Sequence, residues 1–253
     1  MPAAPLIEQV HALQAHHALM RVVTRLDDHS AREPSPLEGW TRGHIVTHLA
    51  RHADSHTRML DGLRRGKQVP QYAGGFASRD REIEEGSSRS ATDLIGDFET
   101  ASATLFEIWE RLDEGLWDEP VDAIGATVPA RALVWSRWCE LELHRIDLDL
   151  GDRPENWSRS FVSSALPWVV SRLSVPARSG RTTTCSVAPD DLAEEWPLVV
   201  DRTRPGTEAN VTVRGPGGLL LGWLTGRLPE GGGGLTVEGA EALPAVPSLY
   251  SDP

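Results

Sequence analysis

The sequence predicts two consecutive domains, a four-helix bundle of residues 1–153 and a smaller α+β domain of residues 154–253. Up to about residue 150, apolar residues recur at helical spacing in four separate stretches, which is the pattern of amphipathic helices. After about residue 155, short β-prone runs alternate with two helical stretches. Gly151 and Pro154 end the fourth helical stretch, so a domain boundary is expected close to them.

The first two helices of the bundle are followed by a long polar segment. The face that the first helix should bury is given by its apolar repeat: Leu6, Val10, Leu13, His17, Met20, Val23 and Leu26. Thr41 is expected to cap the second helix, which should run to about Arg64. Residues 66–90 are rich in Gly, Pro, Ser and charge, and they predict a long connection, which is uncommon unless it has a role such as covering a site.

The last two helices complete the bundle. The third should begin after Ser90, which resembles a capping box with Asp93, and should end at Gly115. Pro129 suits the first turn of the fourth, which should reach Leu148. Such bundles place metal ligands on facing helices. The elements expected in the second domain are helices 160–173 and 216–228 and strands 182–187, 197–200, 210–213 and 235–237.

Composition narrows the possible partners. The net charge at pH 7 is −12, which argues against a surface for nucleic acid or for an anionic membrane. No apolar run approaches the roughly 20 residues that span a bilayer, and no signal peptide is expected. Cys139 and Cys185, the two cysteines, fall in different domains, so a reduced cytoplasmic setting is expected.

A pair of potential metal ligands lies on the predicted fourth helix. Glu140 and His144 are four residues apart and therefore share one helix face, beside Leu141 and Leu148. With a histidine from another helix they would complete a set of two imidazoles and one carboxylate, the usual ligands of a catalytic zinc ion with an open fourth position. The alternative is structural: Arg137, one turn away, could neutralise Glu140 in a buried salt bridge.

The second helix offers a ladder of histidines as the third ligand: His44, His48, His52 and His56. Successive members drift by about 40° around a straight helix, so all four cannot meet one ion, and spacing alone does not choose among them. His48, which sits among apolar neighbours, is the best candidate for a core-facing position, followed by His52. Asp147 could be a further ligand, could orient a ligand imidazole or could be a simple helix-end acid, whereas Cys139 is interpreted as a packing residue.

Both helical stretches resemble motifs of a known family. Residues 39–51, GWTRGHIVTHLAR, and residues 140–148, ELELHRIDL, are similar to the GWTxGHxxxHLAR and ExExHxxDL signatures of mycothiol-dependent maleylpyruvate isomerases. Residues 211–216 and 219–227 are similar to the second domain of that family. The resemblance implies a DinB-like metal-binding bundle followed by a sterol-carrier-like domain. It also implies the metal ligands: His48, Glu140 and His144, with His44 and His52 excluded.

The resemblance further implies a reaction. A zinc ion would activate mycothiol, whose thiolate would add to the cis double bond of maleylpyruvate; rotation and elimination would then give fumarylpyruvate, as in gentisate-type aromatic catabolism. Such a dicarboxylate calls for arginine clamps, and the candidates are Arg79, Arg81 and Arg227. Two alternatives remain open: a mycothiol S-transferase acting on another electrophile, and a non-catalytic metal-binding module.

Overall fold

The chain folds as two compact units, Met1–Leu150 and Gly151–Pro253. The computed structural model describes residues 4–175, 182–201, 210–228 and 233–239, together with residues 243 and 246. Each unit is considered by itself. In the described residues, no helix is both long enough and apolar enough to cross a membrane.

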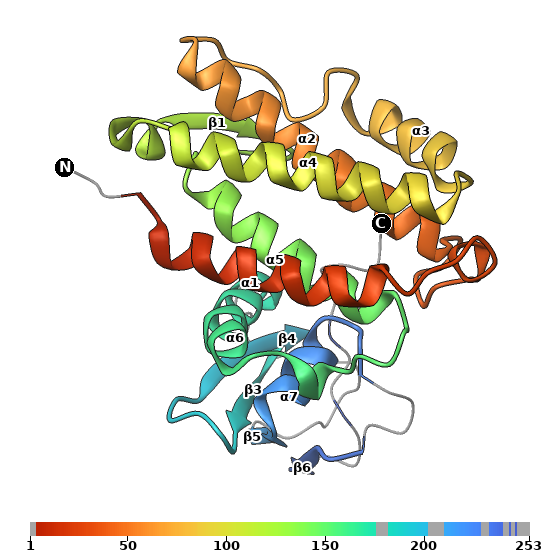
Figure 1. The fold of residues 1–253 in the computed structure, drawn as a ribbon. Coiled ribbons are helices and arrows are strands. Elements are labelled where there is room, and N and C mark those ends of the chain that lie inside the picture. The colour runs from red at the N-terminus through yellow and green to blue at the C-terminus, as the bar shows by residue number, and fades with distance from the viewer. Residues whose placement is uncertain are drawn as a thin grey trace. The chain divides into compact units, whose positions relative to one another are not determined.

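The first unit is helical (Figure 1). Its helices are α1 (Leu6–Val23), α2 (Arg42–Arg64), α3 (Gly75–Ser87), α4 (Ala91–Arg111) and α5 (Ala132–Asp147), with short 3-10 turns at Ser30–Arg32 and Glu114–Asp118. Helix α2 packs against α4 and α3, and α1 packs against α5, while α2 and α5 also meet across the core. Four long helices therefore enclose one apolar core, as the sequence predicts, and α3 is added to them.

Local sequence signals set the helix starts. The hydroxyl of Thr41 accepts from the backbone N–H of His44, and the His44 ring accepts from the backbone N–H of Thr41. This reciprocal cap begins α2 where predicted. Ser90 likewise accepts from the backbone N–H of Asp93 at the start of α4. The predicted apolar register of α4 is also correct, because its members are buried: Leu94, Phe98, Ala101, Leu105, Ile108 and Leu112.

The long connection predicted between α2 and α4 is wrong in part, because it contains α3. The residues that α3 buries are Arg79, Ile83 and Ser87, one turn apart along a single stripe. Only one of the three is apolar, so hydrophobic periodicity could not identify this helix. Pro129 was also misplaced. It ends strand β2 (Ala126–Pro129), which pairs antiparallel with β1 (Pro120–Ala123), and α5 begins three residues later.

The predicted buried face of α1 is wrong from Leu6 to His17. Leu6, Val10, Leu13 and His17 are exposed, whereas the buried residues are Ala12, Ala15, His16, Leu19, Val22 and Val23. Two alanines on this face permit the close approach of α1 to α5, its packing partner. Alanines contribute little to a hydrophobic pattern, so helical periodicity points to the larger apolar residues instead of to the small residues at a close helix contact.

The second unit is α+β, as predicted. Its elements are α6 (Arg159–Leu173), β3 (Thr182–Pro189), β4 (Trp196–Asp201), β5 (Asn210–Gly215), α7 (Gly217–Leu224) and β6 (Thr236–Glu238), with a 3-10 turn at Pro154–Asn156. The sheet has the order β4-β3-β5-β6. Strands β3 and β5 are parallel and the other two pairs are antiparallel. Helix α6 packs on α7 and β4, and α7 packs on β3 and β5.

A buried histidine makes the stability of the first unit depend on pH. His16 of α1 packs against Phe98 and Phe106, with ring centroids 5.2 Å away in both cases. Burial, assisted by the charge of Arg137, lowers the pKa of His16 from 6.5 to about 4. Between these values the unfolded chain binds the proton and the folded chain does not, so the free energy of unfolding falls as pH drops from 6.5 towards 4.

His16→Asn removes this titration. Between pH 6.5 and pH 4, we therefore expect the unfolding free energy of the variant to fall by about 1–3 kcal/mol less than that of the wild type. Urea denaturation at a series of pH values measures this difference, and His17→Asn, at the exposed neighbouring position, is the control. An unchanged pH dependence in His16→Asn would contradict the prediction.

Candidate metal centre

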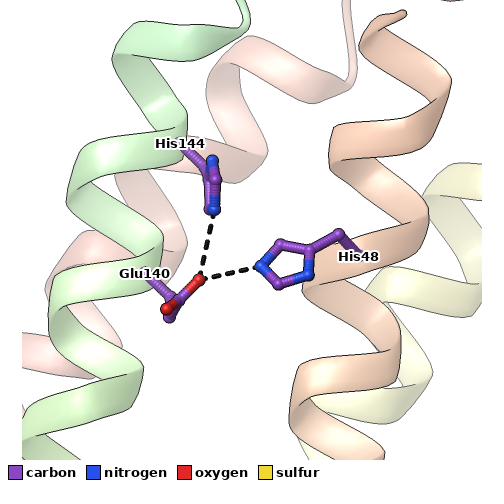
Figure 2. A group of neighbouring side chains, drawn as sticks. All are labelled: His48, Glu140 and His144. Carbon is purple, nitrogen blue, oxygen red and sulfur yellow. Dashed lines mark hydrogen bonds and ion pairs between the residues drawn. The ribbon is translucent and has the colours of Figure 1, made fainter. Parts of the chain in front are cut away.

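Three side chains from α2 and α5 converge in the core of the first unit (Figure 2). The Nε2 atom of His48 lies 2.8 Å from Oε2 of Glu140, and Nε2 of His144 lies 3.2 Å from the same oxygen. The three potential ligand atoms all lie within 4.8 Å of one another, so the group can hold one metal ion. The structure thus brings together the three residues that the sequence motifs single out.

Helical geometry explains why these residues meet. Glu140 and His144 lie on successive turns of α5, and both point towards α2, where His48 faces them (Figure 2). Both histidines are buried, whereas 21% of the Glu140 side chain is exposed. Glu140 is therefore the most exposed of the three side chains in a cluster that is otherwise enclosed by helices.

Asp147 holds the ring of His144 from behind. Its Oδ2 lies 2.9 Å from Nδ1 of His144, and its side chain is almost fully buried. This contact places a proton on Nδ1 and directs Nε2 towards Glu140, the arrangement usual for a ligating histidine. Of the three roles considered for Asp147, the structure therefore shows the orienting one.

The charge states of the cluster suit a cation. Burial lowers the pKa of His48 to about 4, so its ring is neutral near pH 7. Burial alone would raise the pKa of Glu140, but the neighbouring histidines outweigh it and hold this pKa well below its usual range. An ionised carboxylate and a neutral imidazole are the forms that bind metal. Burial alone would lower the pKa of His144, but Asp147 and Glu140 raise it. The two carboxylates therefore favour a positive charge at this ring.

Arg79 of α3 contacts the other side of His48. Its Nη2 donates to Nδ1 of His48 at 3.2 Å, and its guanidinium lies 5.9 Å from the ring centroid of Trp40. Helix α3 can approach α2 this closely because of two glycines. A Cβ at Gly43 would lie 2.2 Å from the backbone oxygen of Ser87, and one at Gly86 would lie 2.5 Å from a methyl of Thr47. Arg79 thus reaches the cluster from a helix that the sequence did not predict.

The other histidines of the ladder have different surroundings. His44 takes part in the α2 cap, and its Nε2 lies 3.1 Å from Glu84. His52 and His56 are buried and lie ring against ring, with centroids 4.1 Å apart. Burial also lowers their pKa values, to about 3 for His56. None of the three joins the group formed by His48, Glu140 and His144.

Arg137 does not take the role of an ion-pair partner for Glu140. Its Nη1 donates to the backbone oxygen of Leu49 at 2.8 Å, and its Nη2 donates to the hydroxyl of Ser102 at 2.8 Å. The fully buried guanidinium therefore ties α5 to α2 and α4. Glu140 has the two imidazoles as its hydrogen-bond partners instead.

Arg81 and Arg227 are the other two arginines that the sequence predicts as substrate clamps. Arg81 is on the exposed face of α3. Arg227 belongs to the second unit, just after α7, where its Nη1 donates to the backbone oxygen of Thr225 at 2.7 Å. Their roles as substrate clamps stay predictions. The contact between Arg79 and His48 was not foreseen, because its only sequence signal was an arginine in a polar segment.

Fold and cluster together define the class of protein: a helical bundle in which two histidines and a glutamate could hold one metal ion, followed by an α+β unit. Residues 12–149, more than half of the chain, match the family described as the mycothiol maleylpyruvate isomerase N-terminal domain. The chain belongs to this family, as its two sequence motifs predict.

Two solved structures share the fold. They are the crystal structure of the mycothiol-dependent maleylpyruvate isomerase and that of a histidine-to-alanine mutant of it. Each is 24% identical to this chain, with a TM-score of 0.82 over 98% of this chain and 100% of the other. No curated protein is significantly similar to the chain in sequence.

Asp147 provides a test of the cluster that leaves its three ligands in place. Asp147→Asn keeps an acceptor for Nδ1 of His144 but removes the negative charge that makes the ring a better ligand. We expect about a tenfold to hundredfold loss of zinc affinity with the fold retained. Competition with a chromophoric chelator measures the affinity, and Asp113→Asn, at an exposed position, is the control. Wild-type affinity in Asp147→Asn would show that this carboxylate does not support a metal ligand.

Proposed function

We propose that this chain is an enzyme that isomerises maleylpyruvate to fumarylpyruvate with mycothiol as thiol cosubstrate and one zinc ion. The observation that carries the proposal is the convergence of His48, Glu140 and His144, with the carboxylate of Glu140 held ionised, in a chain of this family. The similar solved structure is that of a mycothiol-dependent maleylpyruvate isomerase, which supports the choice of thiol and substrate.

The residues fit the proposed metal. Three protein ligands of this type leave a coordination position open for a small molecule. A divalent ion bound there would favour the thiolate over the thiol at neutral pH. His48 and His144 would supply nitrogen donors from two helices, and Glu140 would supply the one negative charge among the three ligands. Asp147 keeps Nε2 of His144 turned towards the site.

The proposed reaction consumes no thiol. The thiolate sulfur forms a bond to one carbon of the cis double bond, and the electron pair of that double bond moves onto the conjugated carbonyl. The carbons are then joined by a single bond, which rotates. The electron pair returns, the carbon–sulfur bond breaks, and the trans isomer and the thiolate are released.

A substrate with two carboxylates needs positive charge beside the reacting bond. Arg79 is the candidate with structural support, because its guanidinium is buried next to His48. Arg81 and Arg227 remain in the proposal as further clamps for the carboxylates. Bidentate contact from a guanidinium would orient the double bond as well as bind it.

The direct test is an assay of zinc-loaded protein with maleylpyruvate, with and without mycothiol. We expect conversion to fumarylpyruvate only when mycothiol is present, with the thiol concentration unchanged at the end. His48→Ala should lower kcat/KM by at least about a hundredfold, because the ligand set is then incomplete. Unchanged maleylpyruvate would refute the proposal, and a stable thiol conjugate seen by mass spectrometry would identify an S-transferase instead.

A further inference from the structure

In both histidines of the cluster, Nδ1 faces away from Glu140, and its partner is an acceptor in one case and a donor in the other. Nδ1 of His144 faces the carboxylate of Asp147, which accepts a hydrogen bond. Nδ1 of His48 faces the guanidinium of Arg79, which has only donors. In the arrangement described, Nδ1 of His48 is therefore the acceptor, and its ring proton lies on Nε2, donated to Glu140 at 2.8 Å.

This arrangement of His48 differs from the one that metal binding requires. When Nε2 binds a metal ion, the proton of a neutral imidazole lies on Nδ1. That N–H would point at the N–H of Arg79, and two donors cannot form a hydrogen bond. The conflict is specific to His48, because Asp147 already accepts from Nδ1 of His144.

Charge adds to this conflict. Arg79, which is ion-paired with Asp80 at 2.8 Å, and the buried Arg137 both lie near the cluster, as do the carboxylates of Glu140 and Asp147. A divalent ion would add positive charge close to the guanidinium of Arg79, and repulsion between buried charges is strong. An anion that enters with the metal relieves it.

We propose that Arg79 changes partner when the site is loaded: its guanidinium leaves Nδ1 of His48 and binds a carboxylate of the molecule that occupies the open metal position. The proposal rests on the metal site of the proposed function. Gly43 and Gly86 let α3 lie close against α2, and the proposal asks only the side chain of Arg79 to move, not the helix. Arg79 would then link metal binding to carboxylate binding.

Zinc titration tests whether Arg79 must leave Nδ1 of His48 when the metal binds. Arg79→Met removes the donor that must be displaced, so we expect zinc affinity to rise about threefold to tenfold above wild type. Arg21→Met loses the same charge from an exposed position of α1 and should match wild type. Unchanged or weaker zinc binding in Arg79→Met, with its circular dichroism retained, would overturn the inference. If wild type itself binds no zinc, the proposed function fails first.

The second half of the proposal is tested with succinate as a simple dicarboxylate. Because coupling between two ligands is reciprocal, succinate should raise the zinc affinity of wild type, and zinc should raise the succinate affinity by the same factor. In Arg79→Met this factor should shrink by at least about threefold, because only the direct coordination of succinate to zinc then couples the two ligands. Equal coupling in the two proteins would overturn the role of Arg79 as the carboxylate partner.

Nitrogen-15 NMR of histidine-labelled protein tests the starting state without relying on zinc. In metal-free wild type, Nδ1 of His48 should be unprotonated and Nε2 protonated. Arg79→Met should weaken this preference, because only the hydrogen bond to Glu140 then supports it, whereas Arg21→Met should keep it in full. A proton on Nδ1 of His48 in metal-free wild type would overturn the proposal.

Discussion

The carboxylate of Glu140, held between imidazoles from two helices, is the interaction on which the centre of the first unit depends. Burial alone would raise the pKa of Glu140, yet the nearby His52 and the hydrogen bonds from His144 and His48 hold this pKa well below its usual range. A buried carboxylate without partners costs several kcal/mol, about 3–5 when a partner is removed. The meeting of α2 and α5 at this point is therefore both a structural contact and a site ready for a cation.

Helix α5 carries most of this arrangement. Arg137 ties it to the backbone of α2 and to α4, which sets its position and rotation in the bundle. One turn further, Glu140 and His144 face α2, and Asp147 fixes the ring of His144. The four residues lie on one side of a single helix, so a packing contact also determines where the potential ligands point. Because such ligands are held by side-chain packing on rigid elements, small displacements of α5 would be felt at the cluster.

Much of this could be predicted from the sequence, and the parts that could not have physical reasons. The i, i+4 spacing of Glu140 and His144 places them on one helix face without further information. Choosing His48 from four evenly spaced histidines required the family resemblance, because spacing cannot tell how α2 is rotated. His44, for example, serves as a capping residue instead.

Other misses arose where tertiary contact overrides local pattern. Helix α3 buries an arginine and a serine beside a single isoleucine, so its stripe has no hydrophobic period. The first half of α1 exposes its large apolar residues, whereas Ala12 and Ala15 are buried. One of these errors affects the site, because Arg79 lies on α3 and contacts His48 where glycines permit the close approach of α3 to α2.

The most direct test of the central claim is anomalous diffraction at the zinc absorption edge, from crystals of protein purified without chelators. The account predicts one peak, about 2.0–2.2 Å from Nε2 of His48, Nε2 of His144 and a carboxylate oxygen of Glu140. A zinc peak at another set of residues, or none in protein that contains stoichiometric zinc in solution, would contradict it.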